Sequence, residues 1–193
     1  MFKTGIPASD IGRSAIWVYD ARIPKYQNTK MKIQMDNLEI NKSIRLSEHF
    51  TLGEVTKTSH QTADGNIPSR VAIENLKNLC ENWLEELRFT YHELYGDKEE
   101  IPLIITSGYR SPEVNKLAGG SPTSNHLTGC AVDIRCMGIE QALRYAAILL
   151  DIADGTNRDY DELYIERNRQ RRYWVHFAVR PKDNRRKTDF LLG

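Results

Sequence analysis

The chain has 193 residues, of which 40% are hydrophobic and 27% are charged, and its formal net charge is +1. This length suits one domain with its own core, and the near-neutral charge offers no general argument for binding nucleic acid or an anionic surface. No apolar run approaches the length of a membrane span, and residues 1–10 lack the apolar segment of a secretory signal. We therefore expect a protein that is made and kept in the cytoplasm, or released by another route.

The three cysteines, Cys80, Cys130 and Cys136, do not form a disulfide framework, because their number is odd and their spacing follows no known pattern. Cys80 falls on the apolar face of a predicted helix and is expected to be a small core residue. Cys130 and Cys136 lie near the candidate site described below, but a neighbouring histidine and aspartate offer better metal ligands.

Residues 1–43 are predicted to be an N-terminal extension with weak strand signals at 16–19 and 31–35. The compact domain is expected to begin near residue 44. Thr51 can cap a short helical turn, and Glu54 three residues later completes a capping box.

The longest predicted helix begins at Ser69, a suitable N-cap residue, and continues to about Tyr95 before Gly96 ends it. Its apolar residues recur at spacings of three and four, which predicts one buried face. We expect this helix to be part of the scaffold.

A β-rich run at 102–107 predicts a central strand that leads into Gly108-Tyr109-Arg110. Ser111 and Pro112 then provide the N-cap and first position of another helix. This helix ends at Gly119-Gly120, and a loop follows it.

The second half of the chain predicts a helix from Gly138 to Gly155 and two strands, at 161–166 and 173–179, joined by a polar hairpin loop. Residues 181–193 form a basic and then apolar tail. Together these elements predict an α+β domain, in which helices flank a small, mainly antiparallel sheet.

Three residues are candidate metal ligands: His126, Asp133 and His176. If 131–134 is a strand, Asp133 points to one face while its neighbours point to the other, and Gly129 lets the loop from His126 turn back tightly. Two histidines and one carboxylate without a fourth protein ligand are typical of an open catalytic zinc site. Taken alone, His176 lies among aromatic residues and also fits the role of a packed polar residue.

A catalytic zinc site also requires a base. The hairpin would place Glu166 opposite 173–175 and close to His176. Glu162 and Asp161 are alternatives, and all these acids can instead serve only as partners of nearby arginines. Arg110 could clamp a substrate carboxylate or stabilise an oxyanion, or it could bridge to an acid in a loop.

Three motifs resemble those of the M15 metallopeptidases, the zinc D-Ala-D-Ala carboxypeptidases and their phage endolysin relatives. The motifs are Ser107-Gly108-Tyr109-Arg110-Ser111-Pro112, Ser124-x-His126-x-x-Gly129-x-Ala131-x-Asp133, and Trp174-Val175-His176. The resemblance covers residues 44–180 and is closest to the M15A-type C-terminal domain. It implies a fold like that of Hedgehog and D,D-peptidase domains, and a zinc hydrolase that cleaves peptidoglycan stem peptides.

The resemblance also implies roles for individual residues. The zinc ligands would be His126, Asp133 and His176, and substrate contacts would come from Arg110, Ser124 and Tyr109. Many M15 enzymes carry the catalytic acid three residues before the last histidine, where this chain has Tyr173. We therefore assign the general base to Glu166, with Arg110 as the second catalytic residue.

The expected function is that of a monomeric zinc peptidase acting on peptidoglycan, either a D-Ala-D-Ala carboxypeptidase or an endolysin-type endopeptidase. It would reach the cell wall when released, as a phage lysin or a virion component, and would bind no nucleic acid. The unusual Tyr173 favours the alternative of a non-catalytic zinc-binding module or phage structural component. The basic stretch at 166–187 is either a solvated face or a surface that holds the anionic wall.

Overall fold

The computed structural model describes residues 41–96 and 101–193, and all of them belong to one compact unit, Glu39–Gly193. At its centre is a five-stranded sheet with the strand order β1-β2-β4-β3-β5. The strands are β1 (Ile105–Ser107), β2 (Ala131–Cys136), β3 (Glu162–Arg167), β4 (Tyr173–Ala178) and β5 (Lys187–Leu192). Every neighbouring pair is antiparallel except β3 and β5, which are parallel. The predicted α+β domain with a mainly antiparallel sheet is confirmed.

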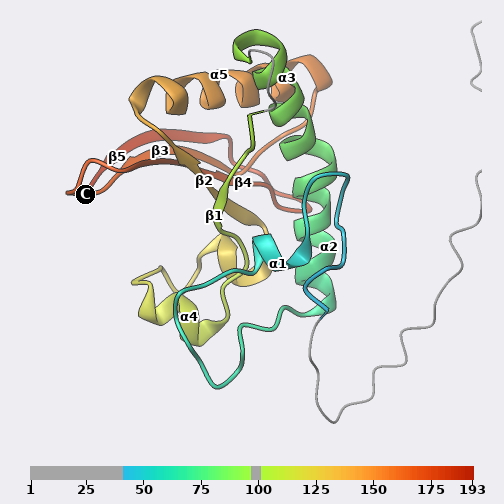
Figure 1. The fold of residues 1–193 in the computed structure, drawn as a ribbon, viewed down its shortest axis with the longest axis vertical. Coiled ribbons are helices and arrows are strands. Elements are labelled where there is room, and N and C mark those ends of the chain that lie inside the picture. The colour runs from blue at the N-terminus through green and yellow to red at the C-terminus, as the bar shows by residue number, and fades with distance from the viewer. Residues whose placement is uncertain (1–40, 97–100) are drawn as a thin grey trace, which may run out of the picture. The chain divides into compact units, whose positions relative to one another are not determined.

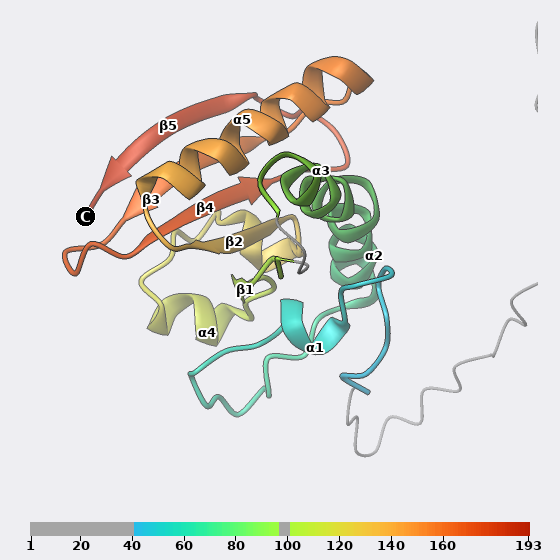
Figure 2. The ribbon, with the colours of Figure 1, turned by 45° about the horizontal axis from the view of Figure 1, so that its top comes forward.

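The two faces of the sheet have different roles. One face packs against α5 (Ile139–Thr156) and carries the apolar residues of the central strands, since side chains alternate along a strand. Phe177 on this face also meets Trp83, with ring centroids 5.0 Å apart. Figures 1 and 2 show α5 on this side and α4 (Pro112–Leu117) on the other. Asp133 and His176 point to the second face, away from the core.

The predicted helix from Ser69 to Tyr95 is confirmed, but a π-helical turn interrupts it. The helix consists of α2 (Arg70–Leu79), the π-helical segment η1 (Cys80–Leu84) and α3 (Glu85–Tyr95). The Ser69 side chain caps α2 by accepting a hydrogen bond from the backbone N–H of Ala72. Cys80, Trp83 and Leu84 of η1 are buried together, at the spacings of three and four that the sequence predicts for one apolar face, whereas the π-helical turn itself has no signal in that spacing.

The shorter helices begin as predicted. Thr51 and Glu54 form the capping box of α1 (Leu52–Val55), and Ser111 caps α4. Helix α5 continues one residue past the predicted end at Gly155. Asn157 ends it in a left-handed conformation (φ 52°), which asparagine tolerates better than most residues.

The prediction of a central strand at 102–107 is wrong, because β1 is shorter and lies at the edge of the sheet. Within residues 41–96 and 101–193 it pairs only with β2, its register is irregular between Ile105 and Ser107, and Ile104 is 44% exposed. At the opposite edge, the tail predicted at 181–193 contributes β5. The strand predictions at 16–19 and 31–35 lie outside the described residues. Within the described part of the chain, no helix is long and apolar enough to cross a membrane.

Candidate metal centre

The three predicted ligands meet on the sheet face opposite α5. His126 comes from the 3-10 helix η2 (Asn125–Thr128), Asp133 from β2 and His176 from β4. Asp133 Oδ1 lies 3.3 Å from His126 Nε2 and 2.9 Å from His176 Nδ1. One ligand atom from each residue can be chosen so that all lie within 4.8 Å of one another, and all three residues are buried.

Local structure explains this convergence. The antiparallel register of β2 and β4 places Asp133 directly opposite His176. Ser124 caps η2 by accepting a hydrogen bond from the backbone N–H of His126. Gly129 ends η2 with φ 70°, at a point where a Cβ atom would lie 2.4 Å from the backbone oxygen of Ala72. Glycine therefore permits both the turn and the close approach of η2 to α2.

The outer hydrogen bonds of the histidines orient their ring nitrogens. His126 Nδ1 lies 2.6 Å from the backbone oxygen of Gly108. A carbonyl only accepts, so Nδ1 carries a hydrogen, and in the neutral ring the lone pair of Nε2 is left on the side of Asp133. His176 directs Nδ1 toward Asp133 and Nε2 toward Glu162 Oε2, 3.4 Å away. Two imidazole nitrogens and one carboxylate oxygen, each facing the same point, fit the donor set of a zinc ion.

Opposite charges reinforce this arrangement. Burial alone would raise the pKa of Asp133, but the charges and hydrogen bonds of His126 and His176 outweigh it and hold that pKa well below its ordinary value. Burial would also lower the pKa of His176, yet hydrogen bonds to Asp133 and Glu162 raise it to about 9. A metal ion would therefore compete with protons for this site.

Arg110 contacts the ligand carboxylate itself. Its Nη2 donates to Asp133 Oδ2 at 2.6 Å and its Nε donates to Ser107 Oγ at 2.8 Å. Arg110 therefore bridges to Asp133, a candidate ligand on β2, and not to an acid in a loop. Of the other predicted substrate contacts, Ser124 is half-buried at the start of η2, whereas Tyr109 is buried in the core. The substrate roles of all three remain predictions.

Glu166 shares the sheet face of the centre. It pairs with Trp174, two positions from His176, so its side chain points to the same side as His176. Burial and the charge of Asp133 raise the pKa of Glu166, while the charges of His176 and Arg110 oppose the shift. The pKa of Glu166 therefore responds to the charges of two candidate ligands, Asp133 and His176.

The alternative acids lie elsewhere. Asp161 is fully buried and forms ion pairs with Arg180 and Arg185. It is thus an acid that neutralises nearby arginines, as one of the alternatives predicts. Glu162 lies behind His176, on the side away from Asp133. Tyr173 has the opposite strand parity to His176 and packs against the core. In this geometry, a side chain at position 173 faces away from the centre.

Sequence reasoning missed a polar network behind His176. Asn125 Nδ2 donates to Asp161 Oδ2 at 2.7 Å and to Glu162 Oε2 at 2.8 Å. Arg185 Nη2 also reaches both acids, at 2.6 and 2.5 Å. The alternation of β3 was a signal that could have placed Glu162 on the face of Glu166. No local signal marked Arg185.

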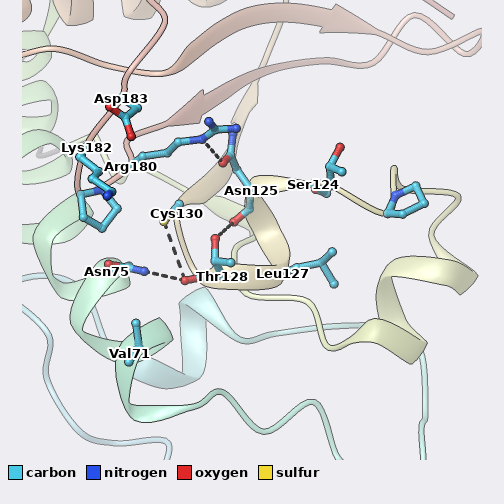
Figure 3. A pocket seen from close by; sticks show the side chains of 13 residues that line it. Val71, Asn75, Ser124, Asn125, Leu127, Thr128, Cys130, Arg180, Lys182 and Asp183 are labelled. Atoms are coloured by element: carbon cyan, nitrogen blue, oxygen red, sulfur yellow. Dashed lines mark hydrogen bonds between the residues drawn. The ribbon is translucent and has the colours of Figure 1, made fainter.

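A groove of about 510 Å³ lies beside η2, between α2 and the chain segment that follows β4. Figure 3 shows Asn75 donating to the backbone oxygen of Thr128, and Arg180 donating to Asn125 Oδ1. Helix η2 therefore lines this groove while its His126 side chain belongs to the candidate metal centre.

A family model described as Peptidase M15 matches residues 48–158. The match contains Arg110, His126 and Asp133, whereas Glu166 and His176 lie beyond it. A search among curated proteins finds no match to the chain. Because the family match spans more than half of the chain and includes two of the three converging residues, the chain belongs to the Peptidase M15 family.

Proposed function

We propose that the protein is a zinc peptidase that hydrolyses peptide bonds in peptidoglycan stem peptides. The observation that carries the proposal is the buried cluster of His126, Asp133 and His176 in a chain of this peptidase family. Two imidazoles and one carboxylate leave room for water and substrate on a zinc ion. The choice of peptidoglycan rests on the three motifs that resemble zinc D-Ala-D-Ala carboxypeptidases and phage endolysins.

A zinc ion, when bound, supplies a Lewis acid that polarises a carbonyl and makes water more acidic. Glu166 is the proposed general base, which accepts a proton from the attacking water and returns it to the leaving amine. Its raised pKa suits that role, because a carboxylate with a higher proton affinity takes up a proton more readily near neutral pH.

Arg110 is the proposed stabiliser of negative charge on the reacting carbonyl. Its Nε and Nη2 are held by Ser107 and Asp133, and its side chain is 18% exposed. Among the described residues, no hydrogen bond to its Nη1 is found. A guanidinium that is fixed on one side and available on the other can bind an oxyanion without first reorganising.

The position of Tyr173 removes the missing acid at 173 as an argument for a non-catalytic zinc site. Its side chain packs against the core, so an acid at this position would not face the ligands. Glu166 points to the same sheet face as His176, which supports its proposed role as the base. Ser124 and Tyr109 remain proposed substrate contacts, and release at the cell wall is the proposed setting.

The test is mass spectrometry of purified peptidoglycan fragments incubated with the zinc-loaded protein. We expect cleavage within the stem peptides, and a loss of about 10²- to 10⁴-fold in rate for Glu166→Gln with zinc binding unchanged. Glu93→Gln, at an exposed position of α3, is the matched control. Wild-type protein that binds zinc but cleaves no fragment would favour a non-catalytic zinc-binding module. Near wild-type cleavage by Glu166→Gln would exclude Glu166 as the base.

A further inference from the structure

His176 is restrained on several sides. Nδ1 faces Asp133, and the ring stacks on Tyr164 with centroids 5.6 Å apart and planes 16° apart. The ring of His126 meets it edge-on at 5.0 Å. Its remaining polar atom, Nε2, faces Glu162 Oε2 at 3.4 Å, at the long end of the hydrogen-bond range. The position of Glu162 therefore determines how well this last contact is kept.

Shorter bonds hold the Glu162 carboxylate from two directions. Asn125, on the same 3-10 helix as His126, donates to Oε2 at 2.8 Å. Arg185, in the segment between β4 and β5, donates to Oε1 at 2.5 Å. The carboxylate is thus tied to the element that carries another candidate ligand and to the C-terminal part of the chain.

Arg185 is itself held by Asp161. Its Nε donates to Oδ1 at 2.7 Å and its Nη2 to Oδ2 at 2.6 Å, which forms a two-pronged pair with a fully buried carboxylate. Such a fork fixes the plane of the guanidinium. It leaves the Nη2 group directed at Glu162 as well.

This arrangement bears on the chemistry of an imidazole ligand. A neutral histidine carries its hydrogen on one nitrogen and binds a metal through the other, and the partner of the outer nitrogen selects which is which. An ionised carboxylate can only accept hydrogen bonds. In the metal-free protein both nitrogens of His176 face an acceptor, Asp133 at Nδ1 and Glu162 at Nε2. When a metal ion takes the place of the proton on Nδ1, Glu162 keeps the remaining hydrogen on Nε2.

We propose that Glu162 is a positioning residue for His176, and that Arg185 extends this support from the C-terminal segment. The inference rests on the proposed metal centre. We assign Glu162 no catalytic role, because its carboxylate contacts the outer nitrogen, Nε2, of the candidate ligand His176. Arg185 acts one step further away, by holding Glu162.

The first test compares Glu162→Ala with Glu162→Gln in the full chain, by zinc titration against a chromophoric chelator. Loss of such an outer partner typically weakens metal binding about 10- to 100-fold, and we expect this for Glu162→Ala. The glutamine carbonyl can still accept from His176, so Glu162→Gln should stay within about threefold of wild type. Nitrogen-15 NMR of the zinc-loaded wild type should show hydrogen on Nε2 of His176, and Glu162→Ala should lose this single form.

The second test concerns Arg185, with its neighbour Arg186 as the matched control. Arg186 also bonds two acids, Asp154 and Asp159, but neither is part of the centre. We expect Arg185→Ala to weaken zinc binding by roughly 3- to 10-fold, part of the loss caused by removing Glu162, and Arg186→Ala to leave it unchanged. If Arg185→Ala does not fold, Arg185→Lys keeps the charge and removes the fork, and it should weaken binding in the same direction.

The outcomes separate this inference from the proposed function. Wild-type protein that binds no zinc would overturn the proposed function. Wild-type protein that binds zinc, with Glu162→Ala equal to it in affinity and in the His176 spectrum, would overturn the inference alone. Equal affinities for the Arg185 and Arg186 variants would remove Arg185 from the proposal.

Discussion

Replacing Gly129 with alanine should disturb the metal centre through the backbone. Gly129 ends η2 at φ 70°, and an added Cβ would lie 2.4 Å from the backbone oxygen of Ala72. Gly119 offers a matched control, because its φ is 71° and an added Cβ would meet no atom within 4 Å. Both substitutions impose the same left-handed strain, but only one also forces a helix and the ligand-bearing turn apart.

The magnitudes follow from this difference. A left-handed alanine costs roughly 1–2 kcal/mol, and reduced freedom of the unfolded chain offsets about 0.4–1 kcal/mol of it. Gly119→Ala should therefore lose about 1 kcal/mol. The contact with Ala72 adds an overpacking cost of about 1–3 kcal/mol, so Gly129→Ala should lose about 3 kcal/mol in total. At 2–4 °C per kcal/mol for a chain of this length, the expected drops in Tm are about 3 °C and roughly 6–12 °C.

Thermal unfolding followed by circular dichroism, on metal-free protein, measures these shifts, and a zinc titration of the same samples measures the effect on the centre. Gly129→Ala should bind zinc about tenfold more weakly, as expected when the supports of a ligand shift, whereas Gly119→Ala should match wild type. Equal losses of Tm in the two variants would show that the close approach of η2 to α2 does not constrain the fold.

Three further predictions concern charged groups. In the metal-free protein, burial and the charge of Asp133 raise the pKa of Glu166 above its ordinary 4.5, so an NMR titration of this carboxyl group should give a midpoint above 4.5. A midpoint at or below that value would contradict the buried, negatively charged surroundings of Glu166. Arg110→Lys keeps the charge but loses the fork, and kcat/KM should fall about 10²-fold, whereas an unchanged value would exclude an oxyanion role. Burial raises the pKa of Asp161, but hydrogen bonds from Arg185 and Asn125 bring it below 3.8, so the ionised carboxylate stabilises the fold above that pH and loses this effect as the pH falls further. Asp161→Asn should therefore lower the free energy of unfolding, measured with urea at pH 7, by about 3 kcal/mol. The difference in this free energy between variant and wild type should shrink below pH 4. A difference that does not change with pH would refute a stabilising ion pair at Asp161.

The candidate ligands could be predicted because their positions follow from local rules. Strand alternation predicts the face of Asp133, and the motif containing His126 specifies a tight turn closed by Gly129. His176 needed the resemblance, since a histidine between aromatic residues has no local mark of a ligand. The structure adds the register that places it opposite Asp133.

The edges of the sheet could not be predicted in the same way. Residues 102–107 have the composition of a strand, but local composition does not reveal how many neighbours a strand has. Every residue of β5 is exposed, so its side chains show no alternation between buried and exposed positions. Its parallel pairing with β3 depends on contacts far apart in the chain.

The two glutamates of β3 illustrate a similar limit within the site. Alternation predicts that Glu162 and Glu166 share a face, but it does not distinguish their partners. Glu162 accepts hydrogen bonds from Asn125 and Arg185, whereas Glu166 lies near the C-terminal end of β3 and its pKa responds to the charge of Asp133. Only the pairing of side chains in three dimensions distinguishes the acid proposed to support a ligand from the acid proposed as the base.

The bond from Arg110 to Asp133 has a consequence for which cation the protein accepts. With Oδ2 engaged by the guanidinium, the carboxylate offers one oxygen to a metal rather than two. Calcium prefers six to eight oxygen ligands and often takes both oxygens of a carboxylate, and magnesium likewise favours oxygen. A set of two nitrogens and a single oxygen disfavours both ions. In the proposed zinc centre, Arg110 would thereby favour zinc over calcium and magnesium.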